Sequence, residues 1–177
     1  LKINRDNFLI IEASSFQLAH SKFVCPDYAI ILNISNDHLD WHGNIQNYVN
    51  SKFKIFKHQN RKQYSLINRN LKKNFKKKFF LGKLIIPNFR AYKKFKLKIK
   101  NSYLVSDINN ENMSFVFTLV KLLGITDRSF LKSLNTFEGL PHRYEIFLKR
   151  KNCTFINDSK ATSFEAAKFA LKNTKNI

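Results

Sequence analysis

Two neighbouring stretches, Leu140-Pro-His-Arg-Tyr-Glu145 and Ile156-Asn-Asp-Ser-Lys-Ala-Thr162, decide how this chain is interpreted. The second stretch gathers an amide, a carboxylate, two hydroxyls and an ammonium between residues 153–156, predicted as a strand, and residues 163–171, predicted as a helix. Polar side chains between a strand end and a helix start lie where α/β proteins bind ligands, and a helix N-terminus attracts anions. A helix cap would explain one of these polar groups, but not the carboxylate, the ammonium and the threonine together.

Two apolar runs, residues 7–12 and 28–34, predict parallel strands, because each is continuously apolar as buried strands are. Glu12 ends the first run, and the second run leads to His38. Parallel strands end at the same edge of a sheet, so we expect this carboxylate and imidazole to be neighbours. Such a pair can hold a divalent cation, and oxygen-rich sites suit magnesium. The structural alternative for Glu12 is an acid held by a helix N-terminus.

A zinc site is the competing interpretation of the segment Asp37-His-Leu-Asp-Trp-His42. His38 and His42 are four residues apart, which suits metal binding when both lie on a helix. Gly43 and the preceding Asn and Asp residues instead predict a loop. We therefore favour a surface loop over zinc.

The remaining elements follow from periodicity and capping signals. Residues 45–59 predict a helix capped by Asn44, with Lys52 beside its apolar face, where a lysine usually extends its head to solvent. Gly139-Leu-Pro141 predicts a domain joint, because proline ends the preceding pattern. The other predicted elements are strands at 63–67, 78–81 and 95–99, helices at 107–123 and 127–134, and a hairpin of 144–148 with 154–156.

Charge and composition set limits on the class of protein. The 177 residues carry a net charge of +20, yet no nucleic-acid-binding motif accompanies the lysines, so we expect a solvated surface and neither a nucleic-acid nor a membrane partner. No apolar run approaches the roughly 18–20 residues that cross a bilayer. Two cysteines without metal spacing fit a reducing cytoplasm. The first residue is Leu1, not Met, so we expect a fragment.

The two opening stretches, together with Ile11-Glu-Ala-Ser-Ser-Phe-Gln-Leu18 and Leu32-Asn-Ile-Ser-Asn-Asp-His-Leu-Asp40, resemble the Mur ligase family in residues and order. The resemblance is closest to members that add D-glutamate to UDP-N-acetylmuramoyl-L-alanine, with ATP, through an acyl phosphate in peptidoglycan synthesis. It implies an α/β fold: a mostly parallel sheet with flanking helices at 1–139, the central ATP-binding domain, and the start of a C-terminal α/β domain at 140–177. The family's phosphate loop is absent from this chain, so we expect it before Leu1 and expect the isolated fragment to be inactive.

The resemblance also implies roles for individual residues. Glu12 and His38 would bind Mg²⁺ together with a carbamate formed on Lys52. The catalytic residues would be Lys52, His38 and Lys160. The ATP-binding residues would be Asn109, Asn112, Arg143 and Asp158, and the residues that hold D-glutamate would be Lys160 and Thr162. Two departures from the family pattern concern the loop after His38, which is one residue shorter, and Ser106-Asp-Ile-Asn109, where the family has Gly-x-His-Asn.

The partners that follow are UDP-N-acetylmuramoyl-L-alanine and D-glutamate, acted on in the cytoplasm by an enzyme that is a monomer when complete. Two alternatives stay open. One is another ligase of the same superfamily, adding a different amino acid or making folylpolyglutamate. The other is a basic nucleic-acid-binding protein without catalysis, which a salt-sensitive interaction with DNA would favour.

Overall fold

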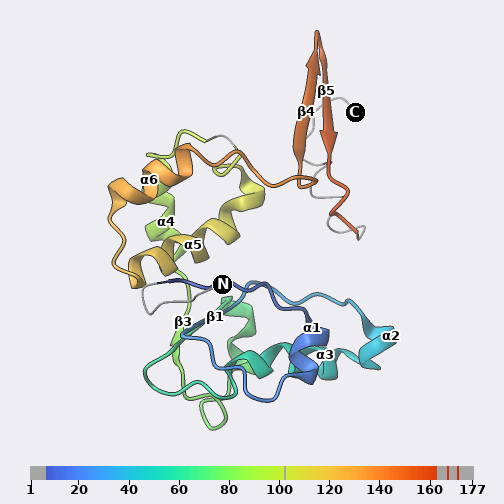
Figure 1. Cartoon of the computed structure of the whole chain (residues 1–177), viewed down its shortest axis with the longest axis vertical. Coiled ribbons are helices and arrows are strands. Elements are labelled where there is room, and N and C mark those ends of the chain that lie inside the picture. Colours follow the sequence, from blue (N-terminus) through green and yellow to red (C-terminus); the bar gives the residue numbers. More distant parts are fainter. Residues whose placement is uncertain (1–6, 102, 163–166, 168–170, 172–177) are drawn as a thin grey trace. The chain divides into compact units, whose positions relative to one another are not determined.

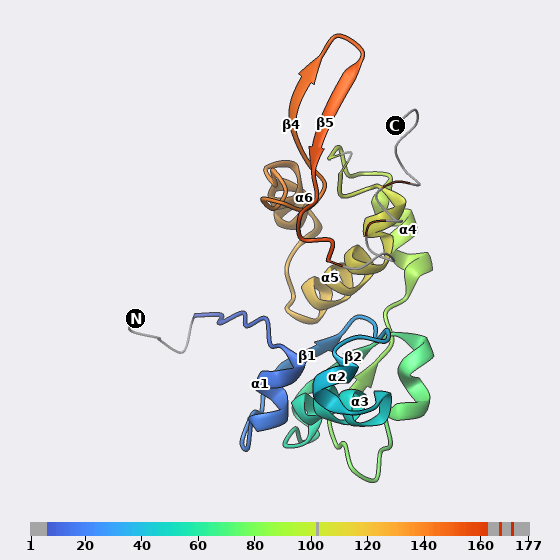
Figure 2. The same cartoon turned by 90° about the vertical axis from the view of Figure 1, so that its right-hand side faces the viewer.

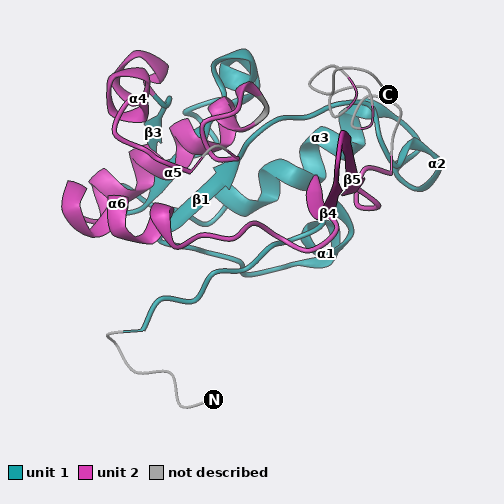
Figure 3. Ribbon diagram, turned by 90° about the horizontal axis from the view of Figure 1, so that it is seen from above, with its two compact units in different colours: residues 1–87 teal, residues 88–177 magenta. Residues whose placement is uncertain are grey.

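The computed structural model describes residues 7–101, 103–162, 167 and 171. Contacts divide the chain into two compact units, unit 1 (Leu1–Pro87) and unit 2 (Asn88–Ile177), which Figure 3 shows in different colours. A division by contacts does not say where the domains of a family meet, so the joint at 139–141 stays a prediction. The predicted helix at 163–171 lies outside the described residues except for Ala167 and Leu171, which are helical.

Unit 1, coloured from blue to green in Figure 1, is built on a three-stranded parallel sheet in the order β1-β2-β3. Its register pairs Ala29 with Ser65 and Ser65 with Leu84. The parallel sheet and its helices confirm the predicted α/β class. The elements of unit 1 are α1 (Ser15–His20), β1 (Tyr28–Ile31), α2 (Leu39–His42), α3 (Ile45–Phe53), η1 (Lys54–Phe56), β2 (Tyr64–Ile67), η2 (Arg69–Asn74) and β3 (Lys83–Ile85).

The core of unit 1 forms where α3 and η1 cover the sheet. Asn44 caps α3 as predicted, since its side-chain oxygen accepts a hydrogen bond from the Asn47 N–H at 2.9 Å. Phe53 and Phe56 are buried in one cluster with apolar residues of β1 and β2. Burying one such phenylalanine stabilises a fold by roughly 1.5–3 kcal/mol, so packing rather than helix propensity holds this helix on the sheet.

The predicted strand at residues 7–12 is wrong. Residues 7–14 form neither helix nor strand, and Phe8 and Ile10 are 76% and 92% exposed. A strand exists only where a neighbour accepts and donates its backbone hydrogen bonds, and the described sheet contains β1, β2 and β3 alone. An apolar run therefore predicts a strand correctly only when such a neighbour is present.

Unit 2 combines helices with a two-stranded antiparallel hairpin (Figure 2). The helices share a buried cluster that includes Tyr92, Phe95 and Phe130. The predicted helices at 107–123 and 127–134 and the predicted hairpin are confirmed. The elements of unit 2 are α4 (Phe89–Lys96), η3 (Asp107–Asn109), α5 (Asn110–Leu122), α6 (Asp127–Asn135), β4 (Glu145–Arg150) and β5 (Cys153–Asn157).

Two further predicted strands are wrong. Residues 95–99 alternate apolar residues with lysines, but they belong to the end of α4 and the turn after it. Asn88 caps α4 by accepting from two backbone N–H groups, and Tyr92, Phe95 and Ile99 are buried at helical spacing. Residues 78–81 lie around a turn, and the strand begins only at Lys83.

Among the described residues, no helix has both the length and the apolar character needed to cross a bilayer.

Candidate functional site

The two sequence blocks predicted to meet in unit 1 do meet, through buried side chains. His42 Nε2 lies 3.0 Å from Ser15 Oγ, and both residues are buried. The ring of Phe16 lies 4.8 Å from the His38 ring and 4.9 Å from the Trp41 ring, measured between centroids. Helix α1 is thus fixed to α2 by one polar contact enclosed in aromatic rings.

Glu12 lies just before this contact region. Helix α1 starts with a capping box, in which Ser14 Oγ accepts from the Gln17 N–H at 3.2 Å and Gln17 Oε1 accepts from the Ser14 N–H at 2.8 Å. The box fixes the chain direction two residues after Glu12, and Phe16, which contacts His38, follows one turn later. Glu12 itself is exposed. The approach of Glu12 to His38 therefore stays a prediction, although Phe16, four residues further on, contacts the His38 ring.

His38 has a left-handed backbone conformation with φ of 51°. Asp37 Oδ1 accepts a hydrogen bond from the His38 N–H at 2.9 Å, and Asp37 Oδ2 lies 3.5 Å from His38 Nε2. A non-glycine residue with positive φ costs energy, and such residues cluster at functional sites. The conformation leaves the imidazole exposed beside a carboxylate.

The structure corrects the predicted loop after His38. Residues Leu39–His42 form one helical turn, α2, for which His38 is the N-cap residue. His42 turns inward to Ser15, whereas His38 faces solvent, so the two imidazoles are used differently. Within the ranges that the structure describes, no three His, Cys, Asp or Glu residues gather as a metal site. That search does not cover a lysine carbamate, so the magnesium site stays a prediction.

Lys52 and His38 approach the same buried ring. Lys52 Nζ lies 4.9 Å from the centroid of the Tyr48 ring, and the His38 ring lies 6.3 Å from it. The structure therefore brings two of the three predicted magnesium ligands to one side chain of α3. A carboxylate, an imidazole and the oxygens of a carbamate form a donor set that fits a hard divalent cation.

In unit 2, the two stretches quoted first are joined at the base of the hairpin, which Figure 2 shows at full length. Lys160 N–H donates to the His142 carbonyl at 3.1 Å, and Tyr144 N–H donates to Asp158 Oδ1 at 2.9 Å. Asn157 Nδ2 lies 2.8 Å from His142 Nδ1. Residues separated by a whole hairpin thus become neighbours through one bond between backbone groups, one bond from a backbone N–H to a carboxylate, and one contact between side chains.

This junction also has a strained backbone. His142 and Tyr144 have φ angles of 64° and 47°, in the region that side chains other than glycine rarely adopt. Between them lies Arg143, whose side chain is exposed, as are those of Lys160 and Thr162. Strain of this kind persists where the surroundings fix it, and here it presents three polar side chains to solvent.

The two asparagines predicted to lie near the nucleotide differ in their surroundings. Asn109 is buried, and its Nδ2 donates to the Tyr103 carbonyl at 2.8 Å and to Ser106 Oγ at 3.3 Å. Asn112 is exposed on α5. Asn109 therefore has a structural role before any nucleotide is considered, and both nucleotide assignments stay predictions.

Sequence reasoning missed the side chains that hold these segments together. Ser15 lies three residues before the buried Leu18, so its place on the inner face of α1 was the available signal. The contact between Asn157 and His142 had no such signal, because it depends on the hairpin register.

The model of the Mur ligase middle domain matches residues 2–126. That range includes Glu12, His38 and Lys52, as well as the α4–α5 part of unit 2.

Curated relatives extend the similarity over nearly the whole chain. A UDP-N-acetylmuramoylalanine–D-glutamate ligase of Natranaerobius thermophilus is 30% identical over 97% of this chain and 42% of the relative. A protein of the same name from Fervidobacterium nodosum is 34% identical over 99% of this chain and 41% of the relative. One from Macrococcus caseolyticus is 36% identical over 92% of this chain and 40% of the relative. The chain thus spans about two fifths of the length of these relatives.

Proposed function

We propose a function on the premise that this chain belongs to the Mur ligase family, whose middle-domain model matches more than half of its residues. The protein of which the chain forms part joins D-glutamate to UDP-N-acetylmuramoyl-L-alanine at the expense of ATP, a step of peptidoglycan synthesis. The observation that carries this proposal is the similarity to D-glutamate ligases over 92–99% of the chain. We propose D-glutamate as the amino acid that is added, rather than another amino acid used by the superfamily.

The proposed reaction has two steps. The carboxylate of UDP-N-acetylmuramoyl-L-alanine attacks the γ-phosphorus of ATP, giving an acyl phosphate and ADP. The amine of D-glutamate then attacks the acyl carbon, and phosphate leaves from the tetrahedral intermediate. Charge accumulates on phosphoryl oxygens in the first step, so stabilisation of that charge and correct placement of the reactants supply most of the catalysis.

In unit 1, Glu12, His38 and a carbamate on Lys52 would hold the magnesium ion. When bound, the ion neutralises negative charge on phosphoryl oxygens. Carbamylation turns the Lys52 ammonium into an anion, which reverses its effect on a nearby cation. The support for this assignment is the shared contact of His38 and Lys52 with the Tyr48 ring and the exposure of Glu12.

In unit 2, Arg143 and Asp158 would contact ATP, with Asn109 and Asn112 near its base. Lys160 and Thr162 would orient D-glutamate, since an ammonium and a hydroxyl recognise a carboxylate. The support is their gathering at the strained hairpin base. We place the reaction in the cytoplasm, which two cysteines without metal spacing fit, with the complete protein acting as a monomer.

The test is an assay of the complete protein for phosphate release that requires both UDP-N-acetylmuramoyl-L-alanine and D-glutamate. The variant Lys160→Ala should lower kcat/KM for D-glutamate roughly 100-fold or more, since misplacing a reactant costs about that much. Lys149→Ala, which removes an exposed lysine from β4 of the same hairpin, should leave kcat/KM within about twofold. Activity with another amino acid in place of D-glutamate would replace this proposal by the related-ligase alternative.

The 177-residue chain alone should release no phosphate from ATP, because it lacks the family's phosphate loop. ATP-dependent phosphate release by the purified chain would contradict this expectation. Salt-sensitive DNA binding by the complete protein, without ligation, would favour the nucleic-acid alternative.

A further inference from the structure

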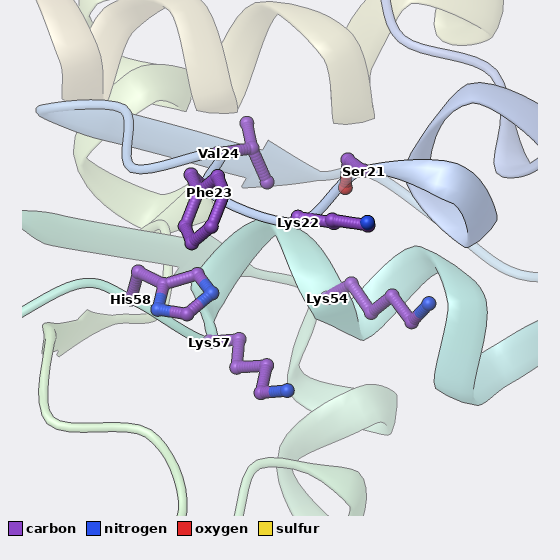
Figure 4. Close-up of a pocket in the computed structure, with 7 residues that line it drawn as sticks. All are labelled: Ser21, Lys22, Phe23, Val24, Lys54, Lys57 and His58. Atoms are coloured by element: carbon purple, nitrogen blue, oxygen red, sulfur yellow. The ribbon is translucent and has the colours of Figure 1, made fainter.

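A half-open cavity of about 440 Å³ lies in unit 1, apart from the predicted magnesium ligands. The loop that joins α1 to β1 forms one wall, and the chain that follows α3 forms the other (Figure 4). Its volume falls within the range of small-molecule sites, roughly 300–1,000 Å³. The lining residues are Ser21, Lys22, Phe23, Val24, Lys54, Lys57 and His58.

The residues that line the cavity are different from the predicted magnesium ligands. Residues 21–24 precede β1 and residues 57–58 precede β2, whereas His38 follows β1. The cavity lies near the contact of α1 with α2, because Ser21 directly follows His20, whose ring lies 5.8 Å from the Trp41 ring. A ligand in this cavity would nevertheless contact a different set of side chains from the ion that His38 is proposed to bind.

The wall of the cavity carries positive charges that no acidic lining residue neutralises. Three of the seven lining residues are lysines and none is acidic. No ion pair among the described residues involves Lys22, Lys54 or Lys57. The surrounding sequence reinforces the charge, since residues 41–106 contain 18 Lys or Arg residues and no Asp or Glu. Ammonium groups gathered in a concave surface raise the local concentration of anions.

One of these lysines is also held in place. Lys54 Nζ donates a hydrogen bond to the Ala19 carbonyl of α1, so its ammonium is oriented before any ligand arrives. An ordered charge loses less conformational entropy on binding than a mobile one. Lys22 and Lys57 are exposed and able to close on an anion from either side of the cavity.

The other side of the cavity is aromatic. Figure 4 shows the rings of Phe23 and His58 next to each other, with the lysine side chains extending away from them. The ring centroids are 6.3 Å apart, and Phe23 is 85% exposed. Cys25 Sγ donates to the His58 carbonyl at 3.1 Å, which ties the loop to the segment after α3. A large apolar ring so exposed beside a second ring offers a surface on which a planar group can stack.

We infer that this cavity is a binding site for a nucleoside monophosphate, whose phosphate contacts Lys22, Lys54 and Lys57 and whose base stacks on Phe23. The lysines provide charge-assisted hydrogen bonds to phosphate oxygens. The ring adds a contact that inorganic phosphate cannot make. The inference does not depend on the proposed ligase function, because none of the lining residues has a role in that function.

The test is a titration of the ¹⁵N-labelled 177-residue chain with AMP and, separately, with inorganic phosphate, followed by NMR. AMP should shift the amide signals of residues 21–24 and 57–58 saturably and bind more tightly than phosphate. Shifts confined to residues 109–112 and 140–162, where the proposed ATP contacts lie, or no saturable binding, would overturn the inference.

Matched variants separate this site from general attraction to a basic protein. The double variant Lys22→Ala/Lys57→Ala should weaken AMP binding roughly tenfold or more, since it removes two charged contacts. Lys72→Ala/Lys73→Ala removes the same charge from exposed positions of η2 and should change the affinity for AMP less than about twofold. Phe23→Ala should weaken binding of AMP but not of phosphate. Equal loss in both double variants, or an unchanged affinity of Phe23→Ala for AMP, would contradict the proposal. The fluorescence of the single tryptophan, Trp41, reports whether each variant is folded.

Discussion

Two places in this molecule bring distant sequence together, and they do so by different means. In unit 1, α1 meets α2 through the buried contact between Ser15 and His42, surrounded by the rings of Phe16 and Trp41. In unit 2, the hairpin base closes through hydrogen bonds from two backbone N–H groups, one of them to the Asp158 carboxylate, and through the contact of Asn157 with His142, while its apolar side chains are largely exposed. Packing is therefore the main support of the first junction, and hydrogen-bond geometry is the main support of the second.

The difference has a consequence for function. A site held by packing loses stability when a supporting side chain is truncated. A site held by backbone groups tolerates truncation of its exposed side chains, which are then available for ligands. This explains how Arg143, Lys160 and Thr162 can all face solvent while the segments that carry them are fixed.

The largest expected effect comes from a pair of histidines at the two junctions. His42→Ala should lower the free energy of unfolding of unit 1 by about 3 kcal/mol, because it leaves a cavity and removes the partner of the buried Ser15 hydroxyl. His142→Ala should cost less than about 1 kcal/mol, since the His142 carbonyl still accepts from Lys160. Urea denaturation, with Trp41 fluorescence for unit 1 and amide exchange for unit 2, measures both. Equal losses of unfolding free energy in the two variants would contradict the proposed difference between the two junctions.

Asp158 tests the second junction directly. Asp158→Ala should destabilise the hairpin base by about 1–2 kcal/mol, because the Tyr144 N–H loses its acceptor. Asp158→Asn keeps an oxygen at that position, so its cost should stay below about 0.5 kcal/mol. Amide exchange of Tyr144 distinguishes the two variants. If both accelerate exchange equally, the charge rather than the hydrogen bond holds the junction.

The contrast between the junctions also explains what could be predicted from the sequence. β1, β2, α3, α5 and α6 were predictable, because each carries its own period, and α3 and α6 also carry a side-chain cap. The strand expected at 95–99 was wrong, since alternation with lysine masked the helical spacing of Tyr92, Phe95 and Ile99, which the cap at Asn88 reinforces. A local sequence pattern predicts the type of an element correctly only where the pattern fits a single periodicity, either that of a helix or that of a strand.

The sequence predicted which segments form the candidate site, but not how their atoms are arranged. The motifs identified the stretches that meet, but not the atoms that join them, such as Ser15 with His42 or the Tyr144 N–H with Asp158. Those contacts depend on the register of β4 and β5 and on the crossing of α1 with α2, which are properties of tertiary structure. The strand expected at 7–12 failed for the same reason, because pairing needs a partner that a local pattern does not reveal.

The stability of unit 2 also depends on a buried polar group, the hydroxyl of Tyr92. Its hydroxyl is buried without a hydrogen-bond partner among the described residues, and burial raises the pKa of Tyr92 above its ordinary value of 10.0. Tyr92→Phe should therefore raise the stability of unit 2 by about 1 kcal/mol at neutral pH, because an unsatisfied buried polar group is removed.

The pH dependence of this effect has a defined sign. Below pH 10 the Tyr92 hydroxyl is protonated in both the folded and the unfolded chain, so its pKa shift changes nothing. As the pH rises above 10, the unfolded chain releases the proton first, and the stability of the unsubstituted protein falls until the raised pKa of the folded state is reached. The advantage of Tyr92→Phe should grow over that range in denaturation curves taken at successive pH values. A constant advantage would mean that the hydroxyl has a partner in solution.

The smallest expected effect concerns the hairpin turn, where Lys151 has a φ of 47°. Lys151 follows β4 directly and occupies the first position of the turn that joins it to β5, a position where positive φ favours glycine. Lys151→Gly should stabilise the hairpin by about 0.5–1 kcal/mol, because glycine adopts this conformation without the steric cost of a side chain. Lys149→Gly, placed within β4, should instead destabilise it by a similar amount, since glycine weakens a strand. Amide exchange across β4 and β5 measures both changes. If Lys151→Gly were also destabilising, the turn would owe its shape to the lysine side chain rather than to the backbone alone.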